Sequence, residues 1–269
     1  MKIATWNVNS IRTRLAQVLN WLEENPVDVL CLQETKVVDA NFPTSDFTAL
    51  GYYVYASGQK SYNGVAILSR TPLIDVSQGF TPVLAEIAVD DLNPLVDEQK
   101  RVISGVLEPG IRIVNLYVPN GAAVASEKYA YKLYWLKILR AYVQTLLDQQ
   151  SRALLICGDF NIALEDRDIH NPQSRENRIM ASEPERQALR AVLELGLADA
   201  FRKFTVAGGC FSWWDYRAAA LQRNWGWRID HIYLTPILYE QAIACTIDCS
   251  PRKLPKPSDH APVIVELST

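Results

Sequence analysis

The sequence lacks an excess of basic residues, paired cysteines and long apolar runs. Its net charge is −3 and its pI is about 5.7, which excludes a generic polyanion-binding protein with a uniformly basic surface. The five cysteines include no Cys-x-x-Cys pair, and their odd number and scattered spacing predict a reducing compartment. No apolar run approaches the length of a membrane-spanning helix. We therefore expect a cytoplasmic protein without membrane attachment.

Apolar residues are abundant enough for a sizeable core. They make up 49% of the chain, which excludes a disordered protein. No linker or low-complexity segment divides the sequence. We therefore expect residues 1–269 to form a single domain.

Short β-rich segments outnumber helical ones. Strands are predicted at 2–7, 27–34, 52–57, 64–69, 84–89, 101–107, 111–118, 153–161, 227–234, 242–249 and 261–267. Helices are predicted at 12–24, 126–149 and 183–195. The first strand–helix–strand unit predicts a parallel strand pair, and the short central runs predict antiparallel pairs. This order predicts an α/β fold of the α+β kind, in which two packed mixed β-sheets are flanked by helices.

Several predicted strands end in polar residues. Those residues are Asn7, Glu34, Tyr117, Asn120, Asp159 and Asn161. In the last strand the order is reversed, because Ser258, Asp259 and His260 precede the apolar run. If that strand runs antiparallel to the others, both sets lie at one edge of a sheet. A single asparagine, glutamate or Gly-Asp-Phe-Asn segment often marks only a turn or an exposed strand end. The repetition nevertheless predicts one polar cluster.

Asp230 lies inside the predicted strand 227–234, among aromatic residues. A buried carboxylate is costly unless it is paired, so we expect Arg228 or a histidine as its partner. The adjacent His231 either competes for this carboxylate or points to the opposite face of the strand. The carboxylate and amide oxygens of the predicted cluster suit Mg²⁺ or Mn²⁺ better than zinc. Such a metal neutralises phosphate oxygens, which predicts cleavage of a phosphate ester.

Motifs spread over essentially the whole chain carry a family resemblance. They are TWNVNSIRTR, DVLCLQETK, GQKSYNGVAILSR, LYVPNG, GDFNIA, DIHNP, FSWWDYR, WGWRIDHI and KPSDHAPV. Together they closely resemble the exodeoxyribonuclease III and apurinic/apyrimidinic endonuclease family, within the endonuclease/exonuclease/phosphatase superfamily. GDFN and SDHAP occur across that superfamily, whereas LQETK, FSWWDYR and WRID in this order are more specific to its DNA-repair branch. The resemblance implies a deoxyribonuclease I-like four-layer sandwich.

The resemblance also implies a metal site for Mg²⁺, with Mn²⁺ as a substitute. Glu34 matches the principal metal ligand, and Asn7 and Asp259 match residues close to the metal. The set that faces the metal is completed by Asp159, Asn161 and His260. The same ligands serve one-metal and moving-metal schemes, so the number of metals stays open.

The resemblance implies a catalytic role for five residues. Asp159 matches the residue that activates or orients the attacking water, although a proton-donor role is an alternative. Asn161 matches a residue that holds Asp159 and stabilises the transition state. Tyr117 matches a contact to the scissile phosphate. His260, oriented by Asp230, matches a group that contacts or protonates a phosphate oxygen.

The family cleaves duplex DNA on the 5′ side of abasic sites. Many members also degrade DNA from 3′ ends and remove 3′-blocking groups. The abasic sugar is swung out of the helix into an apolar pocket. Residues at matching pocket positions are Trp213, Trp227 and Ile229, for which core packing is the ordinary alternative. Residues at matching DNA-contact positions are Lys60, Arg101 and Asn120, although a lone loop cation is often only solvated. We expect duplex DNA as the partner of a monomeric enzyme.

Two other functions remain open at this point. A related phosphoesterase acting on inositol phosphates, sphingolipid or nucleotides would share the metal cluster and the Ser-Asp-His step. The aromatic residues of FSWWDYR and WGWRID argue against it. A non-catalytic DNA-binding relative would lack members of the polar cluster, and all of them are present.

Overall fold

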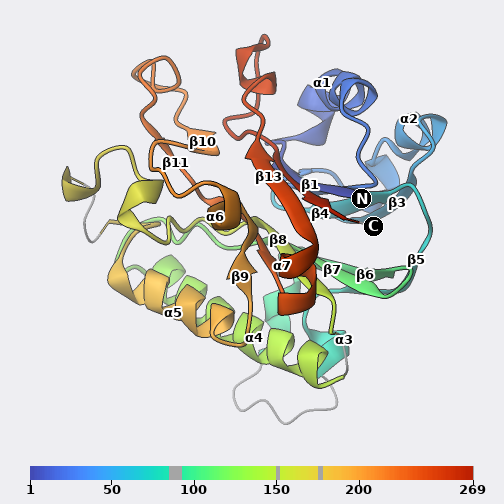
Figure 1. Cartoon of the computed structure of the whole chain (residues 1–269), viewed down its shortest axis with the longest axis horizontal. Coiled ribbons are helices and arrows are strands. Elements are labelled where there is room, and N and C mark those ends of the chain that lie inside the picture. The colour runs from blue at the N-terminus through green and yellow to red at the C-terminus, as the bar shows by residue number, and fades with distance from the viewer. Residues whose placement is uncertain (85–92, 150–151, 175–177, 269) are drawn as a thin grey trace.

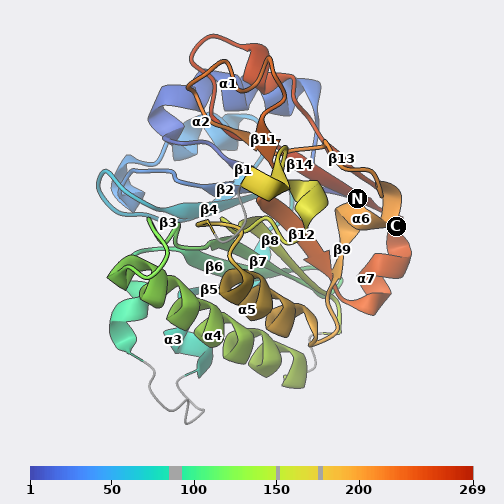
Figure 2. The same ribbon diagram turned by 90° about the vertical axis from the view of Figure 1, so that its left-hand side faces the viewer.

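The computed structural model describes residues 1–84, 93–149, 152–174 and 178–268. Within these ranges, two six-stranded mixed β-sheets pack face to face, and helices cover both outer faces (Figures 1 and 2). The predicted fold of two packed mixed sheets flanked by helices is confirmed. The predicted strand at 84–89 falls, except for its first residue, outside the described residues.

The first sheet places the N-terminal strand beside the C-terminal strand. Its strands are, in spatial order, β13 Ala242–Ile247, β14 Val263–Leu267, β1 Lys2–Asn7, β2 Val29–Gln33, β4 Val65–Ser69 and β3 Tyr53–Ser57. β1 pairs in parallel with β2, as its strand–helix–strand context predicts, and antiparallel with β14. The end of β1 therefore lies beside the start of β14.

In the second sheet, too, an antiparallel pair places the end of one strand, β8 (Leu154–Asp159), beside the start of its neighbour, β12 (Asp230–Leu234). Its strands are, in spatial order, β5 Leu73–Gln78, β6 Val102–Leu107, β7 Ile111–Tyr117, β8 Leu154–Asp159, β12 Asp230–Leu234 and β9 Ala198–Asp199. β7 and β8 are parallel, whereas β8 and β12 are antiparallel.

The prediction of a single strand at 227–234 is wrong. It divides into β12 and a separate short strand, β11 Gly226–Trp227, which pairs with β10 Trp213–Trp214. The division occurs because Trp227 pairs with Trp213, whereas Asp230 pairs with Asp159. Asp230 therefore opens its strand and does not lie in the middle of it.

Most of the helices form the outer layers, whereas the last two in the chain pack against the core between the sheets. They are α1 Ile11–Glu24, α2 Thr44–Ala49, α3 Thr81–Leu84, α4 Glu127–Asp148, α5 Glu183–Leu193, α6 Ala200–Phe204 and α7 Pro236–Gln241. The three predicted helices correspond to α1, α4 and α5. Ser182 and Glu185 form a capping box that starts α5, with a proline in its first turn. Among the described residues, none of the helices has the length and apolarity that a membrane crossing requires.

Strand alternation distributes the core between the layers. Ile3 and Cys31 of the first sheet pack against the second sheet. Ala4 and Leu30, which are the immediate neighbours of Ile3 and Cys31 in the sequence, pack against α1 instead. The outer face of the second sheet packs against α4 and α5, which run along the lower side of the molecule in Figure 1. The two sheets are thus held rigidly, and their shared edge positions the polar strand ends.

Candidate active site

Polar side chains from both sheets meet at one edge. Asn7 is the last residue of β1, and Glu34 directly follows β2. Asp159 ends β8 and lies opposite Asp230, which opens β12. His260 shortly precedes β14, which runs antiparallel to β1. The reversed order of polar and apolar residues in the last strand therefore brings His260 to the same edge as the other four.

Glu34, Asp159 and His260 form a group with the geometry of a metal site. Each offers one ligand atom, and these atoms lie within 4.8 Å of one another. Asn7 Nδ2 donates to Glu34 Oε1 and to Asp159 Oδ2, both at 2.9 Å, so one amide holds the two carboxylates side by side. Burial acts to raise the pKa of Glu34, but Lys36, whose Nζ lies 2.7 Å from Oε2, and Asn7 hold this pKa below its ordinary value. Glu34 is therefore ionised at neutral pH.

Asp159 is held by the residue two positions further along. The Asn161 N–H donates to Asp159 Oδ1 at 2.8 Å, and Asn161 Nδ2 lies 3.3 Å from Oδ2. Asn120 Nδ2 in turn donates to Asn161 Oδ1 at 3.0 Å. Burial raises the pKa of Asp159 to about 7, and Asp230 adds to this while His260 opposes it. Asp159 is therefore the carboxylate of the cluster that gains or loses a proton most readily near neutral pH.

Asp230 pairs with His260, which decides between the two expected partners. His260 Nδ1 lies 2.9 Å from Asp230 Oδ2, and Ser212 Oγ donates to the same oxygen at 2.6 Å. His260 Nε2 lies 3.8 Å from Asp159 Oδ2. Burial alone would lower the pKa of His260, but Asp230 and then Asp159 raise it to about 10. The imidazole is therefore a cation between two carboxylates, with Nδ1 fixed by Asp230.

Arg228 and His231 lie away from this pair. Arg228 Nε donates to Asp168 at 2.7 Å, and Nη2 donates to Asp199 at 2.7 Å. His231 Nε2 is bonded to the main-chain carbonyl of Ile162 at 2.8 Å. His231 thus points to the opposite face of β12, as strand alternation predicts.

Tyr117 and Arg101 lie beside the cluster. The guanidinium carbon of Arg101 lies 4.6 Å from the centroid of the Tyr117 ring, and Arg101 Nη1 donates to the Tyr117 carbonyl at 3.1 Å. Burial raises the pKa of the Tyr117 phenol well above its ordinary value, and the charge of Glu34 adds to that effect. The phenol is therefore a hydrogen-bond donor next to the carboxylates. Arg101 and Asn120 also line a cavity of about 480 Å³.

Asp259 and Lys60 both lie outside the group of Glu34, Asp159 and His260: Asp259 is hydrogen-bonded at its edge, and Lys60 is exposed to solvent. Asp259 Oδ2 accepts from Trp213 Nε1 at 3.0 Å, and Oδ1 accepts from Asn9 Nδ2 at 3.0 Å. The Asp259 carboxylate thus connects the edge of the cluster to the Trp213 ring. Lys60 is exposed in the connection between β3 and β4 and makes no hydrogen bond or ion pair with the described residues.

An aromatic cavity of about 360 Å³ adjoins the cluster. Trp213 and Trp227, which pair in β10 and β11, both line it. Ile229 does not line it but packs behind the wall in the same apolar cluster as Trp227. Met180, with a φ of 69°, and His170 also line it, and no periodicity of the sequence pointed to either. The cavity lies next to Asp259 through the Trp213 ring.

A buried lysine on α4 holds the main chain of two residues of the cluster, Asn120 and Asn161. The ammonium of Lys132 on α4 donates to the carbonyls of Asn161 at 2.7 Å and Asn120 at 3.2 Å. Its third partner is Glu185, at 2.5 Å, and both side chains are fully buried. Sequence reasoning missed Lys132, although a lysine among the apolar residues of a predicted helix is a usable signal.

The residues of the cluster fit a hard divalent cation. The donor set contains the carboxylates of Glu34 and Asp159, with the Asn7 amide beside them. The His260 imidazole lies in the same group, but as a cation it has no lone pair to offer a metal. Burial and neighbouring carboxylates raise the pKa of Asp159, which is the response of a carboxylate in a site that lacks sufficient positive charge. Within the described residues, no cysteine belongs to this group, so oxygen-preferring Mg²⁺ or Mn²⁺ suits it better than zinc.

Comparisons with known proteins agree with this geometry. The model of the Endonuclease/Exonuclease/phosphatase family matches residues 4–260. The chain is 35% identical to exodeoxyribonuclease III of Haemophilus influenzae, over 99% of each chain. A solved AP endonuclease from Archaeoglobus fulgidus has a TM-score of 0.91 and 42% identity, over 100% of both chains. A 3′ phosphatase from Neisseria, solved with a product DNA hairpin, has a TM-score of 0.91 and 40% identity, also over 100% of both.

These matches extend over the whole chain, including both sheets and the edge at which the polar residues meet. The chain therefore belongs to the endonuclease/exonuclease/phosphatase family and is a nuclease of the exodeoxyribonuclease III and AP endonuclease type.

Proposed function

We propose that this enzyme is a Mg²⁺-dependent DNA-repair nuclease that cleaves the phosphodiester 5′ to abasic sites in duplex DNA. It also degrades DNA from 3′ ends and trims blocked 3′ ends, and Mn²⁺ substitutes for Mg²⁺. The proposal rests on one observation: Trp213, which lines an apolar cavity, is paired with His260 of the Glu34, Asp159 and His260 group in a β-bridge and donates to the neighbouring Asp259. The likeness to an AP endonuclease and to a 3′ phosphatase bound to product DNA supports both activities.

The metal-facing residues divide the work of holding the cation. Glu34 is the principal ligand, because it is ionised and bordered by the Asn7 amide. Asp159 and Asn161 face the same position, and Asp259 lies at its edge. His260 also borders this position, but its protonated imidazole serves the phosphate and is not a ligand of the metal. When bound, Mg²⁺ supplies positive charge to the phosphate oxygens of the DNA.

The remaining residues act on the phosphate and on protons. Asp159 orients and deprotonates the attacking water or, alternatively, protonates the leaving oxygen, and Asn161 keeps its carboxylate in place. His260, cationic and fixed by Asp230, binds a phosphate oxygen and stabilises developing negative charge. The Tyr117 phenol donates to the scissile phosphate.

DNA contacts surround this centre. Arg101, Asn120 and Lys60 bind the sugar–phosphate backbone, which gives local positive charge to a chain with a net charge of −3. Trp213 and Trp227 form the wall against which the flipped abasic sugar packs, with Ile229 supporting Trp227 from behind. The enzyme acts as a monomer with one catalytic domain, in the cytoplasm.

A single assay tests this function. End-labelled duplexes carrying an abasic analogue, a recessed 3′ end or a 3′-phosphate are offered with Mg²⁺ and with EDTA. We expect metal-dependent incision 5′ to the abasic analogue, together with shortening or dephosphorylation of the 3′ ends. An intact abasic duplex in the presence of Mg²⁺, alongside active 3′-end trimming, would contradict the endonuclease part of the proposal.

A further inference from the structure

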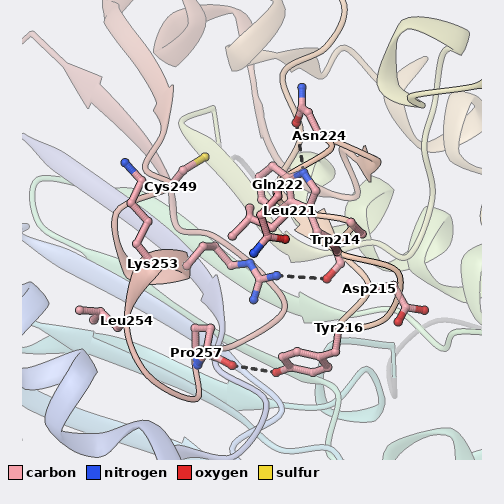
Figure 3. Close-up of a pocket in the computed structure, with 13 residues that line it drawn as sticks. Trp214, Asp215, Tyr216, Leu221, Gln222, Asn224, Cys249, Lys253, Leu254 and Pro257 are labelled. Carbon is pink, nitrogen blue, oxygen red and sulfur yellow. Dashed lines mark hydrogen bonds between the residues drawn. The ribbon is translucent and has the colours of Figure 1, made fainter.

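A second cavity lies on the other side of β10 from the aromatic cavity. Its volume is about 780 Å³, and it opens between the two loops that follow β10 and β13 (Figure 3). Trp214 forms part of its wall, whereas the preceding Trp213 lines the active-site cavity. Asp215 and Ala220 line both. The two cavities therefore adjoin, but none of the predicted catalytic residues lines this one.

Arg252, which lines this second cavity, is a buried cation without a counter-charge beside it. Its side chain belongs to a residue that is only 5% exposed, and it donates to the main-chain carbonyls of Ser258 and, at 3.3 Å, Trp214. Among the described residues, Arg252 Nε has no hydrogen-bond partner, and no carboxylate lies within 4.0 Å of the guanidinium. Its other neighbours are the Trp214 and Tyr216 rings, whose centroids lie 5.8 and 5.7 Å from the guanidinium carbon. Burial lowers the pKa of Arg252, and Asp259, the leading opposing charge, does not restore it.

The other buried cations of the described chain are all paired. Each has a carboxylate partner: Arg112 with Asp75, Lys132 with Glu185, and Arg228 with Asp168. A buried charge without such a partner is costly, because it loses water and gains no attraction in return. An anion in the cavity would supply the missing negative charge to Arg252.

The other lining residues indicate the chemical character of the ligand that would carry the anionic group. Lys253 adds a second cation, and the carboxylate of Asp215 is engaged by Arg217 at 3.1 Å. Leu221 and Leu254 lie with the Trp214 indole around the same space (Figure 3). The cavity therefore suits a negatively charged group carried by a flat, largely apolar body.

We propose that this cavity binds a nucleotide, with the phosphate near Arg252 and Lys253 and the base against the exposed Tyr216 ring in the cavity wall. Charge-assisted bonds to phosphate and base–aromatic stacking are the two interactions that such a wall offers. The choice of a nucleotide among anionic ligands rests on the proposed nuclease function. The chemistry is shared by a free mononucleotide and by the terminal nucleotide of a DNA strand.

Calorimetric titration of the full-length protein tests the site. The probe is 2′-deoxyadenosine 5′-monophosphate, added in EDTA so that DNA cleavage plays no part. We expect Lys253→Glu and Leu254→Glu each to weaken its binding about tenfold or more. The matched control is Lys256→Glu, an exposed residue of the same loop that does not line the cavity, and it should leave the affinity unchanged.

Further probes test the phosphate and the nucleoside separately, and they distinguish a free mononucleotide from the end of a DNA strand. Inorganic phosphate and deoxyadenosine should each bind at least about tenfold more weakly than the mononucleotide. A 5′-phosphorylated trinucleotide that binds much more tightly, and is weakened by the same variants, identifies a strand end as the occupant. Equal affinity identifies the free mononucleotide.

Three results would overturn the site. They are no binding of the mononucleotide, equal binding of inorganic phosphate alone, or binding that Trp213→Ala abolishes while Lys253→Glu and Leu254→Glu retain it. The last result would place the nucleotide in the active-site cavity. Because binding is measured without turnover, none of these results alters the incision assay of the proposed function.

Discussion

Asp159 and Asp230 are register partners in the antiparallel pair β8–β12, and the His260 imidazole interacts with both carboxylates. This arrangement makes His260 a cation, since two buried carboxylates favour its protonated form. It also separates the two carboxylates: Asp230 contacts the imidazole, whereas Asp159 lies beside Glu34 in the group whose possible ligand atoms are within 4.8 Å of one another.

Removal of the metal should abolish cleavage. Activity on an abasic duplex should disappear in EDTA and return with Mg²⁺ or Mn²⁺. Glu34→Gln should lower activity and raise the Mg²⁺ concentration needed for half-maximal rate, because it removes the ionised ligand. The measurement is the initial rate against Mg²⁺ concentration for both proteins. Full activity of the wild type in chelator would refute the metal site.

Loss of the Asp230 charge should lower the rate while DNA binding is kept. Asp230→Asn should reduce kcat on the order of 10²-fold or more between pH 6 and 9, because His260 loses its orienting partner and its charge. Ser212→Ala is the matched control. It removes the hydroxyl that donates to the Asp230 carboxylate and accepts from the Ile229 and Asp230 N–H groups, but it leaves the imidazole pair, so its loss of kcat should be smaller. If Asp230→Asn turns over like the wild type across this range, the pair has only a structural role.

Opening the wall of the aromatic cavity should relax the preference for abasic DNA. Trp213→Ala should narrow the ratio of kcat/KM for abasic and intact duplexes, while the metal requirement stays unchanged. Trp213→Phe separates the effect of the apolar wall from that of the hydrogen bond to Asp259. It keeps an apolar ring in the wall but removes the N–H that donates to the Asp259 carboxylate. Phenylalanine should therefore retain more of the preference than alanine. A folded Trp213→Ala protein with the wild-type ratio would identify Trp213 as a core residue.

The buried Asp168 should make stability depend on acid pH. Burial acts to raise its pKa, but Arg228 holds it below its ordinary value. The stabilisation is therefore present above the unfolded pKa of about 3.9 and is lost as the pH falls through the lower folded value. Asp168→Asn should lower the free energy of unfolding at pH 7 by about 3 kcal/mol, because Arg228 and Arg202 lose a carboxylate.

Urea unfolding followed by circular dichroism at several pH values between 7 and 3 measures this effect. The difference between wild type and Asp168→Asn should shrink as the pH falls through the folded pKa of Asp168. An equal difference at every pH would show that the ion pair does not contribute to the pH dependence.

Local patterns in the sequence were sufficient to predict the layered fold. The apolar runs that become β1, β2 and β8 each end in a polar residue, and the run that becomes β14 begins after one. Such patterns depend on neighbouring residues, so they are visible without the structure. Together with the parallel connection through α1, they predicted that Asn7 and His260 would lie at one edge.

Pairings between distant segments required the tertiary structure. The residue pattern alone left Arg228 and a histidine as candidates for Asp230, and only the family resemblance pointed to His260. The register of β12 against β8 places Asp230 beside Asp159, the pairing of β14 with β1 brings His260 to the same edge, and Arg228 lies against Asp168 instead. The same register splits the predicted strand at 227–234, because Trp227 pairs with Trp213 in a separate ladder.

The buried cations illustrate the same limit. Lys132 and Arg252 look alike in the sequence, because each lies in a segment that also contains apolar residues and other basic residues. Folding brings Glu185 to Lys132 from 53 positions away. To Arg252 it brings main-chain carbonyls, the Trp214 and Tyr216 rings and an open cavity, but no carboxylate of the described residues within 4.0 Å. Amino-acid composition and spacing determine which residues become buried. Whether a buried charge finds a partner depends on contacts between distant segments, which no local pattern encodes.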